Sequence, residues 1–133
     1  MYYKIIKNNI IPFKGYKAMA LWPYIFVRKG ADFGAVEQNH ECIHLHQQVE
    51  TTVAGAIIAL IMLMAGAAWW SLLPLGLFYE LYGMEYVVRL FTNGFNGKMA
   101  YRNISFEREA YLNEADDTYL SRRKGFDWMK HFS

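Results

Sequence analysis

The sequence of 133 residues contains a single cysteine, Cys42, and little excess charge. One cysteine excludes a disulfide within the chain and a cysteine-rich zinc site, so any zinc would need histidine and carboxylate ligands. The 14 basic and 12 acidic residues leave a net charge of +2. The basic residues are scattered, so nothing points to nucleic acid as a partner. At this length we expect one domain, 1–133.

Charge is missing altogether from one long stretch, because no charged residue lies between Glu50 and Glu80. Its first part, 51–68, would be about 27 Å long as a helix, close to the roughly 30 Å of a bilayer's hydrocarbon core. A second apolar segment, 72–92, carries Glu85 and an arginine one turn later. The stretch predicts either a pair of buried core helices or a hairpin that enters a membrane.

The N-terminal 30 residues lack the uninterrupted apolar core of a secretory signal, because Lys4, Lys7, Lys14 and Lys17 divide them. Aromatic and β-branched residues alternate here with turn-forming residues. This pattern predicts two or three short strands or a β-hairpin in residues 1–30.

Three of the four histidines lie within the segment QNHECIHLHQQVE, at 38–50. His40, Glu41 and His44 form the pattern H-E-x-x-H on a predicted helix, 33–68. On a helix, His40 and His44 lie about 40° apart, whereas His46 points to nearly the opposite side from His44.

This spacing suits a metal because two histidines one turn apart can direct their rings at one ion. Glu41 would stand beside the ion without binding it and take a proton from a water that the metal holds. Zn²⁺ lowers the pKa of such a water to about 7. The pattern also arises by chance, so the interpretation needs a third protein ligand.

A second predicted helix, 104–124, offers that ligand. Gluzincins, the zinc peptidases whose third ligand is a glutamate, carry the pattern E-x-x-A/S-D, and Glu107 to Ala110 resemble its first four positions. Tyr111 replaces the aspartate, which in that family accepts a hydrogen bond from a zinc histidine. The resemblance implies Glu107 as the third ligand, and the Tyr111 hydroxyl could take the aspartate's place.

Two alternatives stay open. Glu109, supported by Asn113 one turn later, could bind the metal in place of Glu107. The electrophile that a peptidase needs for the tetrahedral oxyanion could be Tyr101, Arg102 or Tyr111.

The order of the segments resembles two groups of membrane peptidases, the BlaR/MecR-type antibiotic sensors and the CAAX-prenyl-protease and heat-shock protease family. The likeness covers residues 36–116, and its specific part is short. It implies a zinc metallopeptidase that hydrolyses a peptide or protein substrate, with Zn²⁺ on His40, His44 and Glu107 and with Glu41 as the general base.

The expected fold is mainly α with a small β segment (α+β). A metal site needs both ligand helices on one side of a membrane, so we expect a hairpin whose turn, 69–74, reaches the far interface. Basic residues flank both ends of this hairpin and favour a site on the cytoplasmic face of the cytoplasmic membrane. A soluble cytoplasmic protein is the alternative location.

A second functional hypothesis is non-enzymatic. In it, the same histidines and glutamates form a structural metal site, or a polar contact between helices, in a small membrane protein.

Overall fold

A computed structural model describes residues 1–133. Three strands open the chain, β1 (Lys4–Asn8), β2 (Ala18–Leu21) and β3 (Tyr24–Arg28). They form one sheet in the order β1-β3-β2, with β1 parallel and β2 antiparallel to β3. The expected strands are therefore confirmed, and β2 is an edge strand.

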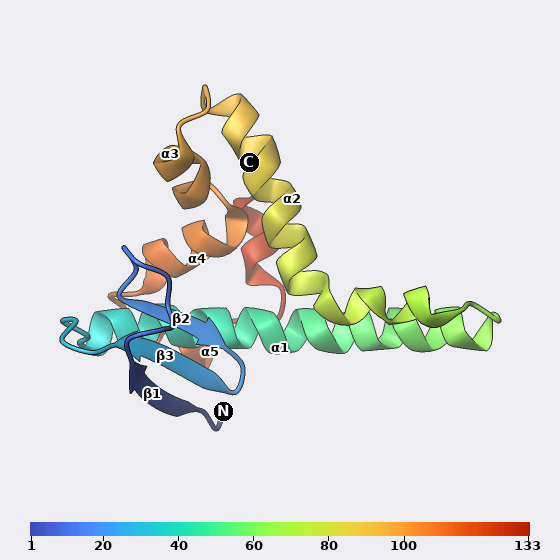
Figure 1. Ribbon diagram of the computed structural model, residues 1–133, viewed down its shortest axis with the longest axis horizontal. Helices are drawn as coiled ribbons and strands as arrows, with labels where there is room; N and C mark the ends of the chain where they lie inside the picture. Colours follow the sequence, from blue (N-terminus) through green and yellow to red (C-terminus); the bar gives the residue numbers. More distant parts are fainter.

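Helices make up most of the remaining chain (Figure 1). They are α1 (Ala35–Met64), the 3-10 helix η1 (Trp69–Gly76), α2 (Leu77–Thr92), α3 (Gly97–Arg102), α4 (Ser105–Asn113), α5 (Tyr119–Arg122) and the 3-10 helix η2 (Asp127–His131). The fold is mainly α with a short N-terminal sheet, as the sequence predicts.

The core lies on two sides of the first half of α1. On one side, Ile25 and Val27 of the sheet pack with Leu45. On the other, Ile43 packs with Ala110 of α4. Ile25, Val27, Ile43 and Leu45 are almost fully buried, which stabilises the fold by roughly 1.5–3 kcal/mol per side chain. This double packing holds α1 between β2 and α4, where the predicted site residues lie.

The second half of α1 extends away from this core and pairs with η1, which runs back along it (Figure 1). We call this projection, residues 51–76, the prong. Its two arms meet closely at Gly55, where an added Cβ would lie 1.8 Å from the Pro74 carbonyl oxygen. Glycine at this position therefore permits the contact.

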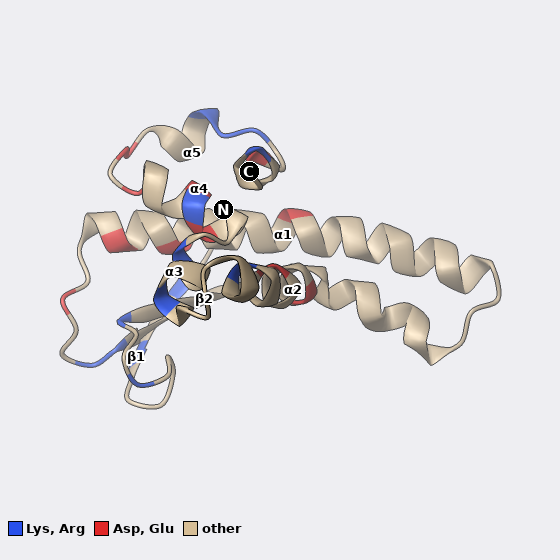
Figure 2. Cartoon of the chain, turned by 90° about the horizontal axis from the view of Figure 1, so that it is seen from above, with Lys and Arg blue, Asp and Glu red and all other residues tan.

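Charged residues lie on the sheet, around the first half of α1 and on the other helices, whereas the projecting ends of α1 and η1 carry none (Figure 2). By length and composition, α1 is the one helix that could cross a membrane. Only 28% of its most apolar window is buried within the protein.

The path of the apolar stretch corrects one expectation. The turn lies at 65–68, not at 69–74, because α1 ends at Met64 and η1 begins at Trp69. The returning arm is the short η1, and α2 then turns away from α1 toward α3 and α4 (Figure 1). Two long antiparallel helices therefore do not form.

The predicted helix 104–124 is also interrupted. α4 ends at Asn113, whose carbonyl accepts the Asp116 N–H in a turn, and the Asp116 carboxylate accepts the Thr118 N–H. Such a local side-chain bond competes with helical hydrogen bonds. The break folds the C-terminal segment back onto α4, where η2 packs against it.

Candidate metal centre

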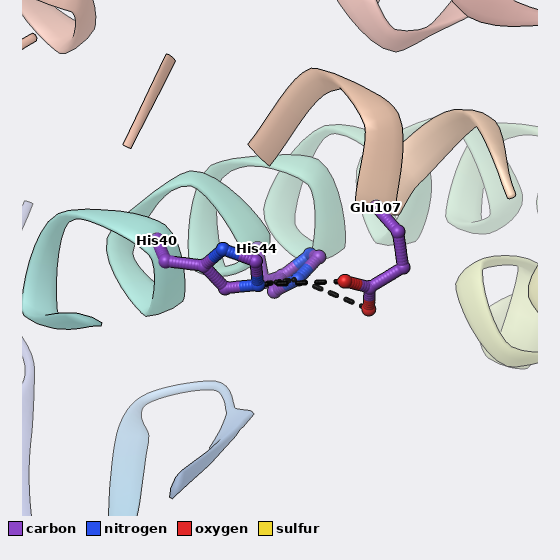
Figure 3. A group of neighbouring side chains, drawn as sticks. All are labelled: His40, His44 and Glu107. Atoms are coloured by element: carbon purple, nitrogen blue, oxygen red, sulfur yellow. Dashed lines mark hydrogen bonds and ion pairs between the residues drawn. The ribbon is translucent and has the colours of Figure 1, made fainter. Parts of the chain in front are cut away.

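The first two predicted ligands lie on the half of α1 that the core encloses. His40 and His44 are one turn apart and buried, at 8% and 6% exposure. Their Nε2 atoms are 3.1 Å apart (Figure 3). The helix that carries them begins at Ala35, where the Glu37 carboxylate accepts the Gly34 N–H.

The third ligand reaches the histidines from α4. Glu107 places Oε1 3.3 Å from Nε2 of His44 and Oε2 3.4 Å from Nε2 of His40 (Figure 3). The start of α4 is held by Glu85 of α2, whose carboxylate accepts both the backbone N–H and the hydroxyl of Ser105. This contact with Ser105 accounts for the buried carboxylate on α2. It also fixes the first turn of α4, which carries Glu107.

The three interatomic distances are each close to the edge of a zinc tetrahedron, with the two histidines meeting different oxygens of Glu107. Zinc bonds to nitrogen or oxygen of about 2.0–2.1 Å imply ligand atoms about 3.3 Å apart. The observed separations run from 3.1 Å to 3.4 Å. One ion at the centre of this group would reach all three residues.

Hydrogen bonds behind the rings decide where the imidazole protons lie. Nδ1 of His40 lies 2.7 Å from the Glu114 carboxylate, and Nδ1 of His44 lies 2.7 Å from Oε1 of Gln47. The Gln47 amide is oriented because its Nε2 donates to the Phe106 carbonyl and to Glu109. Both histidines therefore donate from Nδ1, and their Nε2 lone pairs face Glu107.

Two lone pairs and a carboxylate directed at one point suit a cation. Oε2 of Glu107 is buried and accepts no hydrogen bond, so its lone pairs are available to coordinate a metal. Burial would raise the pKa of Glu107, yet the two histidines outweigh it and hold this pKa well below its usual range. Burial likewise disfavours charged His44, but Glu107 raises the pKa of His44 to about 9. The donor set fits a metal ion, and without one it attracts a proton.

Glu41 lies beside this group without joining it. It lines the same cleft as His44 and Glu107. Burial raises the pKa of Glu41, and the two histidines oppose this rise. A carboxylate with a raised pKa, next to two histidines that could hold a metal, suits the exchange of a proton with water.

The cleft has a volume of about 980 Å³ and lies between β2 and the helices α1 to α4. The three residues that the sequence suggested for the oxyanion, Tyr101, Arg102 and Tyr111, all line it. The guanidinium carbon of Arg102 stands 4.7 Å over the Tyr111 ring. That ring in turn lies edge-on to His40, with centroids 4.7 Å apart.

The residue that accepts a hydrogen bond from His40 differs from the expected one. The sequence suggested that the Tyr111 hydroxyl could accept its proton, but Tyr111 offers its ring and Glu114 accepts the hydrogen bond. Glu114 is the C-cap residue that directly follows α4, at the break in the predicted helix.

The open choice between two glutamates has a clear geometric answer. Glu107 faces the histidines, whereas Glu109 is bound to Arg123, to the Tyr119 hydroxyl and to Gln47. Glu109 therefore supports the site only through Gln47. Asn113, its suggested companion, donates to the Glu109 carbonyl.

His46 lies away from the metal group, as its helical angle predicts, and lines a separate small pocket with Tyr3 and Cys42. Sequence reasoning missed three residues of the site. Gln47 shares the His44 face of the helix, which was a usable signal. Glu114 and Tyr82, whose hydroxyl donates to Glu107 at 2.7 Å, had none, because folding alone brings them to the metal group.

Comparisons of the chain with protein-family models, characterised proteins and solved structures find no match.

Proposed function

We propose that the protein is a zinc metallopeptidase of the gluzincin type. The observation that carries this proposal is the convergence of His40, His44 and Glu107, with both histidine tautomers set for metal binding. Two imidazoles and one carboxylate are a common catalytic zinc set, and three protein ligands leave a fourth position open. Glu41 and a large cleft lie next to that position.

Bound zinc would polarise a peptide carbonyl and make hydroxide available near neutral pH. Glu41 then takes a proton from the attacking water, whose oxygen bonds to the carbonyl carbon. The same carboxyl group returns the proton to the amide nitrogen as the C–N bond breaks, which yields one acid and one amine. Tyr101, Arg102 and Tyr111 line the cleft and are the candidates to meet negative charge on the former carbonyl oxygen.

The experiment that tests this function is Glu41→Gln in the zinc-loaded protein. The amide has nearly the same shape but cannot carry the proton, so hydrolysis of a mixed peptide library should fall about 10²–10⁴-fold. Zinc content and melting temperature should stay unchanged. Glu80→Gln, which changes an exposed glutamate on α2, is the matched control and should hydrolyse normally.

The same experiment distinguishes the peptidase from the non-enzymatic alternative, a structural metal site. The burial of all three ligands favours that alternative. If the metal is only structural, the zinc-loaded wild type and Glu41→Gln will both leave the library intact. Hydrolysis by Glu41→Gln at the wild-type rate would reject the mechanism.

We also propose that the prong inserts into a membrane from the cytoplasmic side. From Thr51 to Met64 it is about 20 Å long, so it would enter a bilayer of about 30 Å without crossing it. Exposed apolar side chains surround much of this part of α1: Val53, Ile57, Ile58, Leu60, Ile61, Leu63 and Met64. A protein partner would cover one face, whereas lipid covers every exposed side.

The tip of the prong also suits hydrocarbon. The N–H groups of Ala65, Gly66 and Ala67 donate to carbonyls at the end of α1. Unpaired backbone groups are costly in lipid, so this closure removes a main obstacle to insertion. Basic residues before α1 and after α2 favour the cytoplasmic face.

A further inference from the structure

Strand β2 presents one free edge to the metal cleft. The sheet order leaves β2 unpaired on one side, and all four of its residues line the cleft. The Lys17 carbonyl accepts the Arg28 N–H, so alternate residues bond to β3 from there on. The backbone groups of Ala18, Ala20 and Trp22 therefore face outward.

The side chain of Gln48 occupies one end of this edge. Its Oε1 accepts the Trp22 N–H and its Nε2 donates to the Ala20 carbonyl, both at 2.8 Å. These are the two hydrogen bonds that a peptide group of a neighbouring strand would make. Gln48 is 5% exposed and lies one turn after His44. The side chain that occupies the β2 edge therefore belongs to the helix that carries His40 and His44.

The remaining free groups lie toward the start of β2. They are the N–H and carbonyl of Ala18, because the Ala20 N–H bonds to the Glu41 carboxylate. Beyond Ala18 the Tyr16 ring meets the Tyr101 ring of α3, with centroids 5.9 Å apart, and this end of the cleft has aromatic walls.

Resting on the proposed peptidase function, we infer that Gln48 restricts the substrate to backbone pairing on one side of the scissile bond. An added strand pairs most stably antiparallel, so the peptide would run from the Gln48 end toward Ala18. The residues after the scissile bond then pair with Ala18 and meet the aromatic walls. The residues before it find Ala20 and Trp22 already bonded. The substrate class is a peptide with an apolar residue just after the cleaved bond and few required residues before it.

Two series of peptide hydroxamates test this inference on the zinc-loaded protein, because a hydroxamate anchors each peptide at the metal. One series extends from the metal toward the N-terminal side of a substrate, and the other toward the C-terminal side. We expect the affinity of the C-terminal series to rise about tenfold over the first two residues, and that of the N-terminal series to stay constant. Equal gains in both series, gains in the N-terminal series alone, or no binding by either would overturn the inference.

The variant Gln48→Met keeps the length of the side chain and removes both hydrogen bonds. It should let the N-terminal series gain several-fold and leave the C-terminal series unchanged. Gln38→Met, on the same helix but bonded to Tyr3, is the control and should change neither. If Gln48→Met does not fold, the two wild-type series still decide.

These readouts measure binding, so they are independent of turnover. Asymmetric binding without any hydrolysis would reject the peptidase and keep the one-sided strand edge. Glu41-dependent hydrolysis with symmetric binding would keep the peptidase and reject the one-sided strand edge.

Discussion

The two halves of α1 differ in a way that a helix in water does not explain. The first half buries polar side chains, among them His40, His44 and Gln47, while the second half exposes apolar ones such as Ile57 and Ile61. Soluble helices do the opposite on both counts. The ring nitrogens of His40 and His44 and the Gln47 amide each have a partner or face the metal position, so their burial serves a site. Beyond Thr52 the second half has no polar side chain to satisfy, which fits a surrounding without water.

The largest expected effect lies in the first half. His40→Ala and His44→Ala should each lose zinc on dialysis, as measured by metal analysis, because two protein ligands remain of three. The loss should exceed the roughly 10–100-fold that removal of a supporting residue costs. His46→Ala is the control, since its ring lines a different pocket, and it should keep the metal. Zinc loss in His46→Ala with zinc retained in His40→Ala would remove the assigned site.

The second half should respond to charge instead. Ile57→Lys and Ile61→Lys each place an ammonium on the exposed face of the prong and should weaken binding to lipid vesicles by about 3 kcal/mol, roughly 100-fold. Vesicle flotation measures this. Ile10→Lys adds the same charge at an exposed position outside the prong and should float like the wild type. If all three variants float like the wild type, the prong lies in water or against a protein.

A smaller effect tests the demand of the first half for a cation. The folded state raises the pKa of His44 from 6.5 to about 9, so protonation stabilises the metal-free protein fully below pH 6.5. This stabilisation is lost as the pH rises toward 9, which should lower the free energy of unfolding by roughly 1–3 kcal/mol. Thermal melts with a chelator and with zinc, at pH 6 to 9, measure it. The zinc-loaded protein should not show the decline, and a chelated protein that is equally stable at both ends would contradict the expectation.

The smallest effect concerns packing within the prong. Gly55→Ala should force η1 away from α1 and cost about 1–3 kcal/mol of stability, because its Cβ would overlap the Pro74 carbonyl. Gly83→Ala, in the interior of α2 with no atom within 4 Å of the new Cβ, should instead stabilise by about 0.5–1 kcal/mol. Calorimetry on both variants checks the contrast, and a neutral Gly55→Ala would mean that the arms separate freely.

Much of this contrast could be predicted from local pattern. Helical spacing places His40 and His44 on one face and His46 away from it, since those angles depend on one helix alone. The boundaries of the charge-free stretch, Glu50 and Glu80, are close to the ends of the prong. The turn was misplaced because tryptophan, proline and glycine suggest a break, whereas the 3-10 helix accommodates them and the chain reverses at 65–68.

The sequence by itself determined the helix with its two histidines, the strands before it and the apolar stretch after it. These follow from residue spacing and composition within one segment. Only the tertiary structure decided that Glu107 and not Glu109 meets the histidines, that Glu114 sets the proton of His40, and that Gln48 occupies the edge of β2. Each of these contacts joins different elements or the end of a helix, so it depends on how α4 and the sheet pack on α1, which no local pattern encodes.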